Sequence, residues 1–282
     1  MKDKIGFIGQ GWIGKNYAND FEARGYETVR YALEEPYIHN KSKLKECSMI
    51  FIAVPTPTDH KGFNIDYVVS ALSVVPAGAT AVIKSTMVPG TTKKLQALFP
   101  DVYVFHSPEF LVEKTAAYDA ANPNRNIVGV PEMNEECIKR AQSVLDVLPA
   151  APFCKVMSSH EAELVKYAGN CFLFTKVIYM NMLYDLVKES GGEWESVREA
   201  LVHDKRIGDT HTQPVFDDGR GAGGHCFIKD FEAFRQLHKN TVNDDKANAV
   251  LKAMVELNIE LLTRSNKSLD LLTDTYNFDI KD

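Results

Sequence analysis

A glycine-rich turn follows the first apolar run of the chain. Ile5-Gly6-Phe7-Ile8 leads directly into Gly9-Gln10-Gly11-Trp12-Ile13-Gly14, after which an amphipathic stretch begins. In such a turn the first glycine permits a tight bend and the second lets a pyrophosphate approach the backbone. The third lets the following helix pack closely, and its N-terminus attracts negative charge. An ordinary strand-turn-helix is the alternative, but position and spacing favour a dinucleotide site that includes Trp12 and Ile13.

The chain up to about Pro152 alternates short apolar runs with amphipathic stretches. This pattern is typical of a parallel sheet covered by helices, and right-handed crossovers make it doubly wound. We therefore predict an α/β fold with a Rossmann-type sheet. The predicted strands are Lys4–Ile8, Glu27–Tyr31, Met49–Val54, Thr80–Lys84, Val102–Phe105 and Asn126–Val130. The predicted helices are Trp12–Arg24, Asp66–Val75 and Glu135–Leu148.

After Pro152 the pattern becomes helical. Ser158-Ser159-His160-Glu161 resembles a capping box, and one long helix is predicted from Ser159 to Ser190, where Gly191-Gly192 ends it. Further helices are predicted over Glu193–His203, Lys229–Lys239 and about Val242–Arg264. We predict a dinucleotide-binding domain over residues 1–155 and a mainly helical domain over 156–282. The last helix is apolar enough to need a partner surface, in its own domain or in a homodimer.

Composition excludes several classes of function. The net charge is −6, and no run of Lys and Arg interleaved with aromatics is present, so nucleic acid is not an expected partner. No apolar stretch approaches the roughly 18 residues that span a bilayer, so no membrane is expected. The five cysteines are widely spaced without a C-x-x-C pair. This argues against a metal site and for reduced thiols in a cytoplasmic protein.

The residues expected at the adenosine end of a dinucleotide are less regular. Ala32 stands where an acidic residue usually binds the ribose 2′-hydroxyl, and Glu34 and Glu35 follow it. Arg30 could attract a 2′-phosphate. On balance NAD is favoured over NADP.

A second glycine-rich segment contains Cys226. Glycines at positions 219, 221, 223 and 224 precede it, and Lys229-Asp230 follow. Such a segment predicts a tight functional loop in which His225 and Lys229 favour the thiolate. The other cysteines are interpreted as inert buried side chains. From spacing alone, a nucleophilic Cys226 and an inert one are about equally supported.

Several segments, in order along the chain, resemble the UDP-glucose/GDP-mannose dehydrogenase family. The resemblance covers about residues 4 to 265. Its motifs are Val54-Pro55-Thr56-Pro57, Ser85-Thr86 with Gly90-Thr91, Ser107-Pro108-Glu109-Phe110-Leu111-x-Glu113, Lys166-Tyr167-Ala168-x-Asn170, Arg206-Ile207-Gly208 and Gly219-x-Gly221-x-Gly223-Gly224-x-Cys226-x-x-Lys229-Asp230.

The resemblance implies oxidation of a sugar-nucleotide primary alcohol to a carboxylate, with Cys226 carrying a thiohemiacetal and then a thioester. It implies that Lys166 stabilises an oxyanion, Asn170 orients the substrate, and Asp230, Thr86 and Glu113 position or activate water. Without the resemblance, we would interpret Lys166 as a solvated helix residue and Asn170 as a packing amide. Cofactor contacts are implied for Val54, Pro55, Thr56, Ser85, Thr86 and Lys229. Substrate contacts are implied for Glu109, Phe110, Leu111, Lys166, Asn170, Gly219 and Gly223, with a phosphate or carboxylate contact for Arg206.

The sequence departs from the family in three places. Ala222 replaces a usual aromatic residue and Ile228 a usual proline. Only 52 residues follow Asp230, too few for the third, nucleotide-binding domain of the family, which would take about 100. Four hypotheses follow: a compact enzyme for a sugar nucleotide or smaller sugar, a split enzyme whose partner chain supplies the nucleotide-binding domain, a cofactor-binding protein without catalysis, and a single-step hydroxyacid dehydrogenase.

Overall fold

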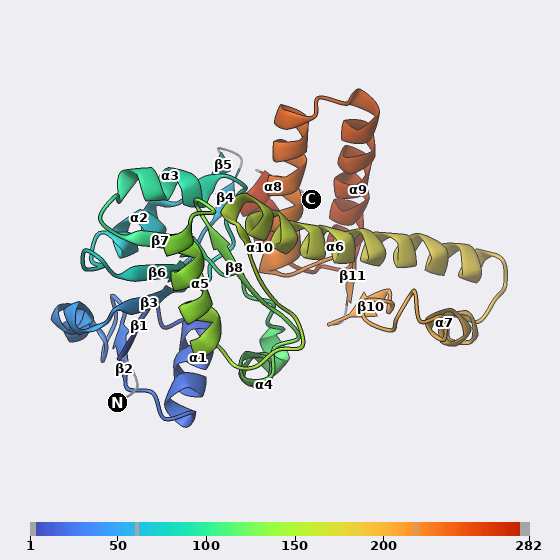
Figure 1. The fold of residues 1–282 in the computed structure, drawn as a ribbon. Helices are drawn as coiled ribbons and strands as arrows, with labels where there is room; N and C mark the ends of the chain where they lie inside the picture. The colour runs from blue at the N-terminus through green and yellow to red at the C-terminus, as the bar shows by residue number, and fades with distance from the viewer. Residues whose placement is uncertain (1–3, 60–61, 218, 277–282) are drawn as a thin grey trace. The chain divides into compact units, whose positions relative to one another are not determined.

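The chain forms two compact units, shown in Figure 1. The computed structural model describes residues 4–59, 62–217 and 219–276. The first unit holds the chain up to Pro57 together with Asn64–Lys166, and the second holds Thr58–Phe63 and the chain from Tyr167 onward. The predicted boundary lies at residue 155, where the strand pattern of the sequence ends. The structure places it at Lys166, because the first turns of the long helix pack on the sheet.

A seven-stranded sheet forms the centre of the first unit, in the order β2-β1-β3-β6-β7-β8-β9. Its strands are β1 (Ile5–Ile8), β2 (Thr28–Tyr31), β3 (Met49–Ile52), β6 (Thr80–Ile83), β7 (Tyr103–His106), β8 (Asn126–Val130) and β9 (Cys154–Ser158). The first five in chain order are parallel to one another. The predicted Rossmann-type sheet is confirmed, and each predicted strand is present with its ends shifted by one or two residues at most.

The far edge of the sheet differs from an all-parallel arrangement. β8 is antiparallel to β7, and β9 is parallel to β8. An antiparallel neighbour needs no crossover helix, and the chain between β7 and β8 holds only short helical turns. β9 was not predicted, because it is an edge strand with a polar, exposed N-terminal half.

Helices cover both faces of this sheet, with α2 and α3 on one face and α1, α4 and α5 on the other (Figure 1). Phe7 of β1 packs on Phe21 of α1 and on Phe51 of β3, with ring centroids 5.3 and 5.4 Å apart. The helical elements are α1 (Trp12–Ala23), η1 (Ile38–Glu46), α2 (Asp66–Leu72), α3 (Thr91–Leu98), η2 (Glu113–Thr115), α4 (Ala116–Ala121) and α5 (Glu135–Val147). Because β2 and β3 lie on opposite sides of β1, the crevice expected for a ligand opens at the carboxyl ends of β1 and β3.

The long helix α6 (Ser159–Glu189) begins where the sequence predicts. The Ser158 amide donates to Glu161 Oε2 at 3.0 Å, and the Glu161 amide donates back to Ser158 Oγ at 3.3 Å. This reciprocal pair is the predicted capping box. Gly129 of β8 lies under the helix, since a Cβ there would approach Ala162 to 2.6 Å.

The second unit is mainly helical. Phe174 of α6 stacks on Phe231 of α8 at 3.9 Å between centroids, and Ile228, Leu262 and Leu272 form a further buried cluster. α9 therefore packs within its own unit. Besides α6 the elements are α7 (Trp194–Val202), β10 (Val215–Phe216), β11 (Gly219–Arg220), α8 (His225–Thr241), α9 (Asp245–Arg264), α10 (Leu269–Tyr276) and the hairpin of β4 (Thr58–Asp59) and β5 (Gly62–Phe63). Among the described residues, no helix combines the length and apolar character that crossing a bilayer requires.

Candidate functional site

The first glycine turn has the geometry that a dinucleotide fingerprint needs. Gly9 has φ +89°, and a Cβ there would lie 2.2 Å from the carbonyl oxygen of Ala53. A Cβ at Gly14 would lie 2.0 Å from the carbonyl oxygen of Gly9. Gly11 differs, because it is exposed and nothing lies within 4 Å of its Cβ position. Two glycines thus close the turn, and the third leaves open backbone at the N-terminus of α1, where a pyrophosphate could bind.

The loops that follow β3 and β6 are tied to each other at the same edge of the sheet. Ser85 Oγ donates to the Val54 carbonyl at 2.6 Å and accepts from the Val54 amide at 3.0 Å. Thr56 Oγ1 donates to the Thr86 carbonyl at 2.9 Å. The structure therefore brings together four of the predicted cofactor-side residues. Pro55 between them is exposed.

Lys166 is buried and forms an ion pair. Its Nζ donates to Glu109 Oε1 at 2.7 Å and to the Glu109 carbonyl at 2.9 Å, and both side chains are at least 95% buried. The other carboxylate oxygen of Glu109 accepts from the Leu111 amide at 2.8 Å. The interpretation of Lys166 as a solvated residue is therefore wrong. Phe110 lies beside this pair, with its ring 5.8 Å from Lys166 Nζ.

Glu113 has different surroundings from Glu109. It begins η2 and is exposed to solvent. Lys166 thus pairs with the glutamate at 109, while the one at 113 remains available to groups in solution. Thr86 is buried at the end of β6.

Cys226 lies in a helix rather than in the predicted loop. α8 begins at His225, four residues earlier than predicted, so Cys226 is its second residue. The side chain of Cys226 is exposed. Gly224 directly precedes the helix and has φ +81°. Glycine adopts a positive φ more readily than other residues. The N-terminus of a helix stabilises a nearby anion. This position at the helix N-terminus, rather than a loop, is therefore the reason to expect a thiolate at Cys226. The side chain of His225 lies outside the described part of the structure.

Asp230 follows Cys226 by one helical turn and is almost fully buried. Asn170 Nδ2 donates to its Oδ2 at 2.6 Å, and Lys229 Nζ donates to its Oδ1 at 2.5 Å. Three predicted site residues are therefore in contact, and each carboxylate oxygen has a donor. Cys171 lies against the backbone of Asp230, and burial raises the pKa of its thiol, which keeps it protonated.

The second glycine loop is shaped by residues that sequence reasoning missed. Asn258, buried in α9, accepts from the Ala222 amide at 2.7 Å and donates to the Ala222 carbonyl at 3.0 Å. Lys267 Nζ donates to the carbonyls of Phe216, Gly219 and Gly221 at 2.7, 3.3 and 3.3 Å. The one signal in the sequence is an asparagine between Leu257 and Ile259, inside an otherwise apolar stretch.

Three glycines of this loop lie close to side chains of α9 and of the turn after it. A Cβ at Gly219 would lie 2.8 Å from Lys267 Cδ, one at Gly221 3.0 Å from Asn258 Oδ1, and one at Gly223 2.8 Å from Ser268 Oγ. The C-terminal end of α9 and the turn after it therefore fix the chain that leads into Cys226.

One further prediction, on the cysteines, is corrected. Cys47, Cys137 and Cys171 are buried as predicted, but Cys154 is exposed on the edge strand β9. Burial raises the pKa of Cys47 to about 11, so that thiol is unreactive at neutral pH. Arg206 is exposed and pairs with Asp204 at 2.5 Å. Its predicted phosphate or carboxylate contact stays a prediction.

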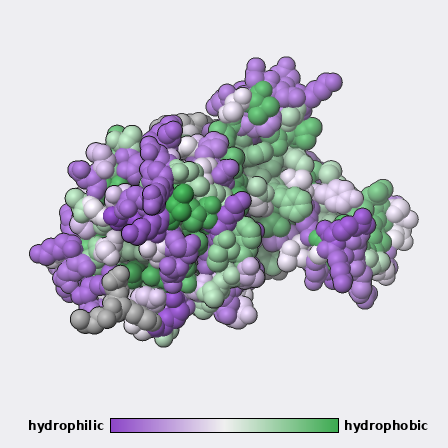
Figure 2. All heavy atoms as spheres, in the orientation of Figure 1, coloured by the Kyte–Doolittle hydropathy of each residue, from purple (hydrophilic) through white to green (hydrophobic). Residues whose placement is uncertain are grey.

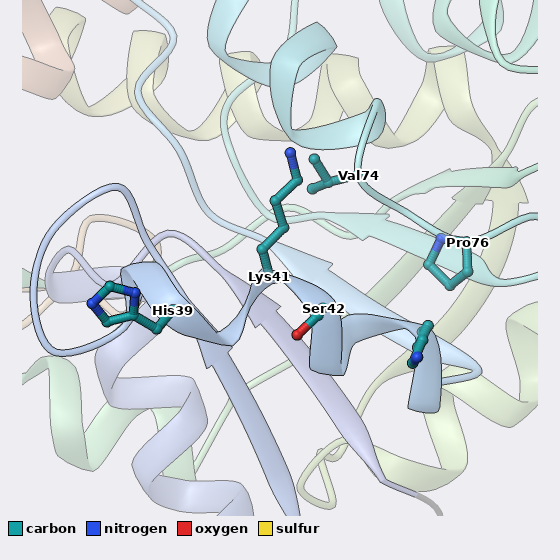
Figure 3. Close-up of a pocket in the computed structure, with 6 residues that line it drawn as sticks. His39, Lys41, Ser42, Val74 and Pro76 are labelled. Atoms are coloured by element: carbon teal, nitrogen blue, oxygen red, sulfur yellow. The ribbon is translucent and has the colours of Figure 1, made fainter.

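A surface pocket lies away from these residues. His39, Lys41, Ser42 and Lys45 of η1 line it together with Val74 and Pro76, and Figure 3 labels all of these except Lys45. η1 and the segment after α2 lead into the starts of β3 and β6, whereas the fingerprint follows the end of β1. The pocket is therefore not part of the candidate site. Within the described residues, no three His, Cys, Asp or Glu side chains gather as a metal site requires.

Two family models match the chain in succession. Residues 35–147 match the NAD binding domain of the UDP-glucose/GDP-mannose dehydrogenase family, and residues 160–260 match its central domain. The chain belongs to this family. It is 32% identical to a UDP-glucose 6-dehydrogenase of Rickettsia felis over 95% of its own length. It spans 60% of the length of that relative.

Solved structures agree with the fold. A UDP-glucose dehydrogenase of the archaeon Pyrobaculum islandicum superposes with a TM-score of 0.80 at 27% identity, covering 94% of this chain and 69% of that one. A 3-hydroxyisobutyrate dehydrogenase of Mycobacterium tuberculosis superposes with a TM-score of 0.72 at 15% identity, covering 94% of this chain and 95% of that one. At that identity the second likeness concerns the fold alone.

Proposed function

We propose that this chain oxidises the primary alcohol of a sugar nucleotide to a carboxylate, with NAD as oxidant and Cys226 as nucleophile. The observation that supports this best is the N-terminal turn of α8. There an exposed thiol stands one turn before a buried carboxylate that is held by Lys229 and Asn170. A protein that only bound a dinucleotide would have no use for this arrangement.

The proposed chemistry has two oxidations and one hydrolysis. The dinucleotide site would supply one NAD as hydride acceptor for each oxidation, so that two NAD molecules are used in turn. Loss of a hydride and a proton converts the alcohol to an aldehyde, and the Cys226 thiolate then adds to the carbonyl carbon while the oxygen takes up a proton. A second loss of hydride and proton from this thiohemiacetal leaves a thioester. Water breaks the C–S bond, which releases the carboxylate and regenerates the thiol.

The other residues receive roles from the family resemblance and from their surroundings. Lys166 would stabilise an oxyanion, because its ammonium group is buried and fixed by Glu109. Asn170 would orient the substrate and Asp230, with Thr86, would position water. Glu113 is exposed, so its carboxylate would activate water by accepting a proton from it. Phe110 and Leu111 of the same segment, with Gly219 and Gly223, would contact the sugar.

The cofactor is proposed to be NAD rather than NADP. Gly9, Gly11, Trp12, Ile13 and Gly14 would bind its pyrophosphate end, and Val54, Pro55, Thr56 and Ser85 its nicotinamide side. Arg30, the one cation expected to attract a 2′-phosphate, is already paired with Glu22 at 2.7 Å and hydrogen-bonded to Asn19 at 2.8 Å. Rates with each cofactor test this, and a preference for NADP would contradict it.

The reaction is tested by counting reduced cofactor. The protein is incubated with NAD and either UDP-glucose or GDP-mannose, and NADH and carboxylate are both measured. We expect two NADH per carboxylate, and loss of carboxylate formation in Cys226→Ala. Cys154→Ala is the matched control, because Cys154 is the other exposed cysteine among the described residues. Turnover that survives Cys226→Ala with one NADH per product would instead indicate a single-step dehydrogenase.

The nucleotide requirement is the second part of the test. Because the chain spans 60% of its Rickettsia felis relative, the sugar nucleotide and any partner chain belong to the proposal. Turnover that begins only when a second chain is added would indicate a split enzyme. Binding of NAD without turnover of any sugar would indicate a cofactor-binding protein.

The predicted homodimer has a candidate surface on α6. Phe172, Tyr179, Met182 and Leu186 are exposed at spacings that place them on one side of the helix. Apolar residues gather over α6 in Figure 2. The dimer stays a prediction, which light scattering tests: Leu186→Glu should give a monomer if this surface mediates it.

A further inference from the structure

A second buried lysine lies beside the Glu109–Lys166 pair in the first unit. Lys84 directly follows the end of β6 and is 3% exposed. Its Nζ donates to Ser107 Oγ at 3.2 Å and lies 3.5 Å from the Pro108 carbonyl and 4.5 Å from the centre of the Tyr17 ring. None of the family motifs quoted above includes it.

Two amines therefore hold three successive residues. Lys84 binds Ser107 and Pro108, and Lys166 binds both the carbonyl and the carboxylate of Glu109. This is the start of the segment Ser107–Glu113, to which the proposed function assigns the sugar contacts. Both lysines therefore contact the start of this segment.

The charges in this cluster do not balance when both lysines are protonated. Glu109 is the one carboxylate that acts on Lys84, while Lys166 repels it. Burial lowers the pKa of Lys84 to about 7, an effect that Glu109 opposes and Lys166 reinforces. The other titratable neighbours stay uncharged near neutral pH. Burial lowers the pKa of His106 to about 3 and raises the pKa of Tyr17.

We propose that Lys84 is a positioning residue. When the Lys84 amine is uncharged, Glu109 pairs with Lys166 alone and the segment Ser107–Glu113 is held in place. When the amine is protonated, the Glu109–Lys166 pair is weakened and the segment becomes less firmly held. Below neutral pH, a second buried ammonium group competes for the single carboxylate. Above neutral pH, one ammonium faces one carboxylate, and the cluster carries no excess charge.

The kinetic test rests on the proposed function. In the wild type, the kcat for NADH formation should fall about tenfold from pH 8.5 to pH 6, because one pH unit below its pKa about a tenth of an amine is uncharged. Lys84→Met is permanently neutral and should lose less than threefold over the same range. Lys84→Arg is permanently charged and should be low at both pH values. KM should change less than kcat, and any pH dependence due to Cys226 is common to all three proteins.

A second measurement needs no substrate. Amide hydrogen exchange of residues 107–113, corrected for the intrinsic effect of pH, reports how firmly the segment is held. We expect less protection at pH 6 than at pH 8.5 in the wild type. Lys84→Met should show the same protection at both pH values, below the wild-type value at pH 8.5 because methionine cannot donate to Ser107 or Pro108. Lys84→Arg should show low protection at both pH values. Lys94→Met is the control for removing an exposed lysine.

The two measurements separate the failures. Absence of NADH formation in every protein, with the expected exchange pattern, would overturn the proposed function and leave the positioning role supported. A wild type whose exchange and kcat follow pH in the same way as Lys84→Met would overturn the role of Lys84. If Lys84→Met does not fold, Lys84→Gln serves in its place.

Discussion

The two glycine-rich turns of this chain both lead into a helix N-terminus, yet glycine is required in them for different reasons. At Gly9 and Gly14 an added Cβ would meet backbone atoms, the carbonyl of Ala53 just after the neighbouring strand β3 and the carbonyl of Gly9. At Gly219 and Gly223 it would meet side chains, those of Lys267 and Ser268 in the turn after α9. The first turn is therefore enclosed by backbone, and the second is moulded against side chains beyond a helix end.

This difference predicts how each turn tolerates change. A backbone obstacle cannot move without displacing a strand, whereas a side-chain obstacle can be removed by a second substitution. The first turn should therefore fail outright when a closing glycine is replaced. The second should fail partially and recover.

The largest effect is expected for Gly14→Ala. The new Cβ would lie 2.0 Å from the Gly9 carbonyl oxygen, so α1 or the turn must shift. Overpacking of this kind costs about 1–3 kcal/mol and occasionally more, and we expect the upper end or beyond. Urea denaturation followed by circular dichroism measures it. A loss under about 1 kcal/mol would show that the turn adapts and would remove the contrast.

Asn258→Ala should cost somewhat less, about 2 kcal/mol. It removes both hydrogen bonds to Ala222, which is 2% exposed, and leaves a buried amide and carbonyl unpaired. Because Ala222 precedes Cys226 in the moulded turn, the rate of alkylation of Cys226 by iodoacetamide should also change. Cys154, alkylated in the same sample, is the internal reference. Asn258→Leu keeps the approximate size of the side chain and should show the same loss of stability. Full stability in both variants would mean that the turn keeps its conformation without Asn258.

Gly223→Ala is expected to cost about 1–2 kcal/mol, because its Cβ meets Ser268 Oγ at 2.8 Å. Ser268 itself has φ +54°, so Ser268→Gly relieves both the contact and the backbone. The double variant Gly223→Ala/Ser268→Gly should regain about half of the loss. If the two substitutions change the free energy of unfolding additively in a double-mutant cycle, contact with Ser268 is not what requires glycine at position 223.

The same distinction explains which parts of the molecule the sequence predicts. The fingerprint, the strands and the capping box of α6 depend on residues within a few positions of each other, and their patterns predict them to within one or two residues. The formation of β9 and the antiparallel direction of β8 depend on pairing at the edge of the sheet, which no local pattern indicates. α10 and the hairpin of β4 and β5 take their places from tertiary packing. The start of α8 at His225 was missed because the glycines between positions 219 and 224 suggested a continuing loop.

The candidate site divides in the same way. Family motifs identified Cys226, Asp230, Asn170 and Lys166, but not their surroundings. The burial of Lys166 against Glu109, the second lysine at 84 and the anchoring of the loop by Asn258 and Lys267 all involve partners distant in sequence. No local pattern encodes such contacts.

Gly11→Ala should have the smallest effect on stability and is the sharpest test of the first turn. Nothing lies within 4 Å of its Cβ position, and its φ of −64° suits alanine. Because alanine is a poorer N-cap than glycine, the substitution should cost about 0.5–1 kcal/mol. The added methyl group would occupy the surface over which a pyrophosphate must pass, so NAD affinity should fall at least tenfold. Titration calorimetry of NAD measures this beside the unfolding experiment. Unchanged affinity would mean that this open backbone binds no dinucleotide, and the two turns would then differ only in how they fold.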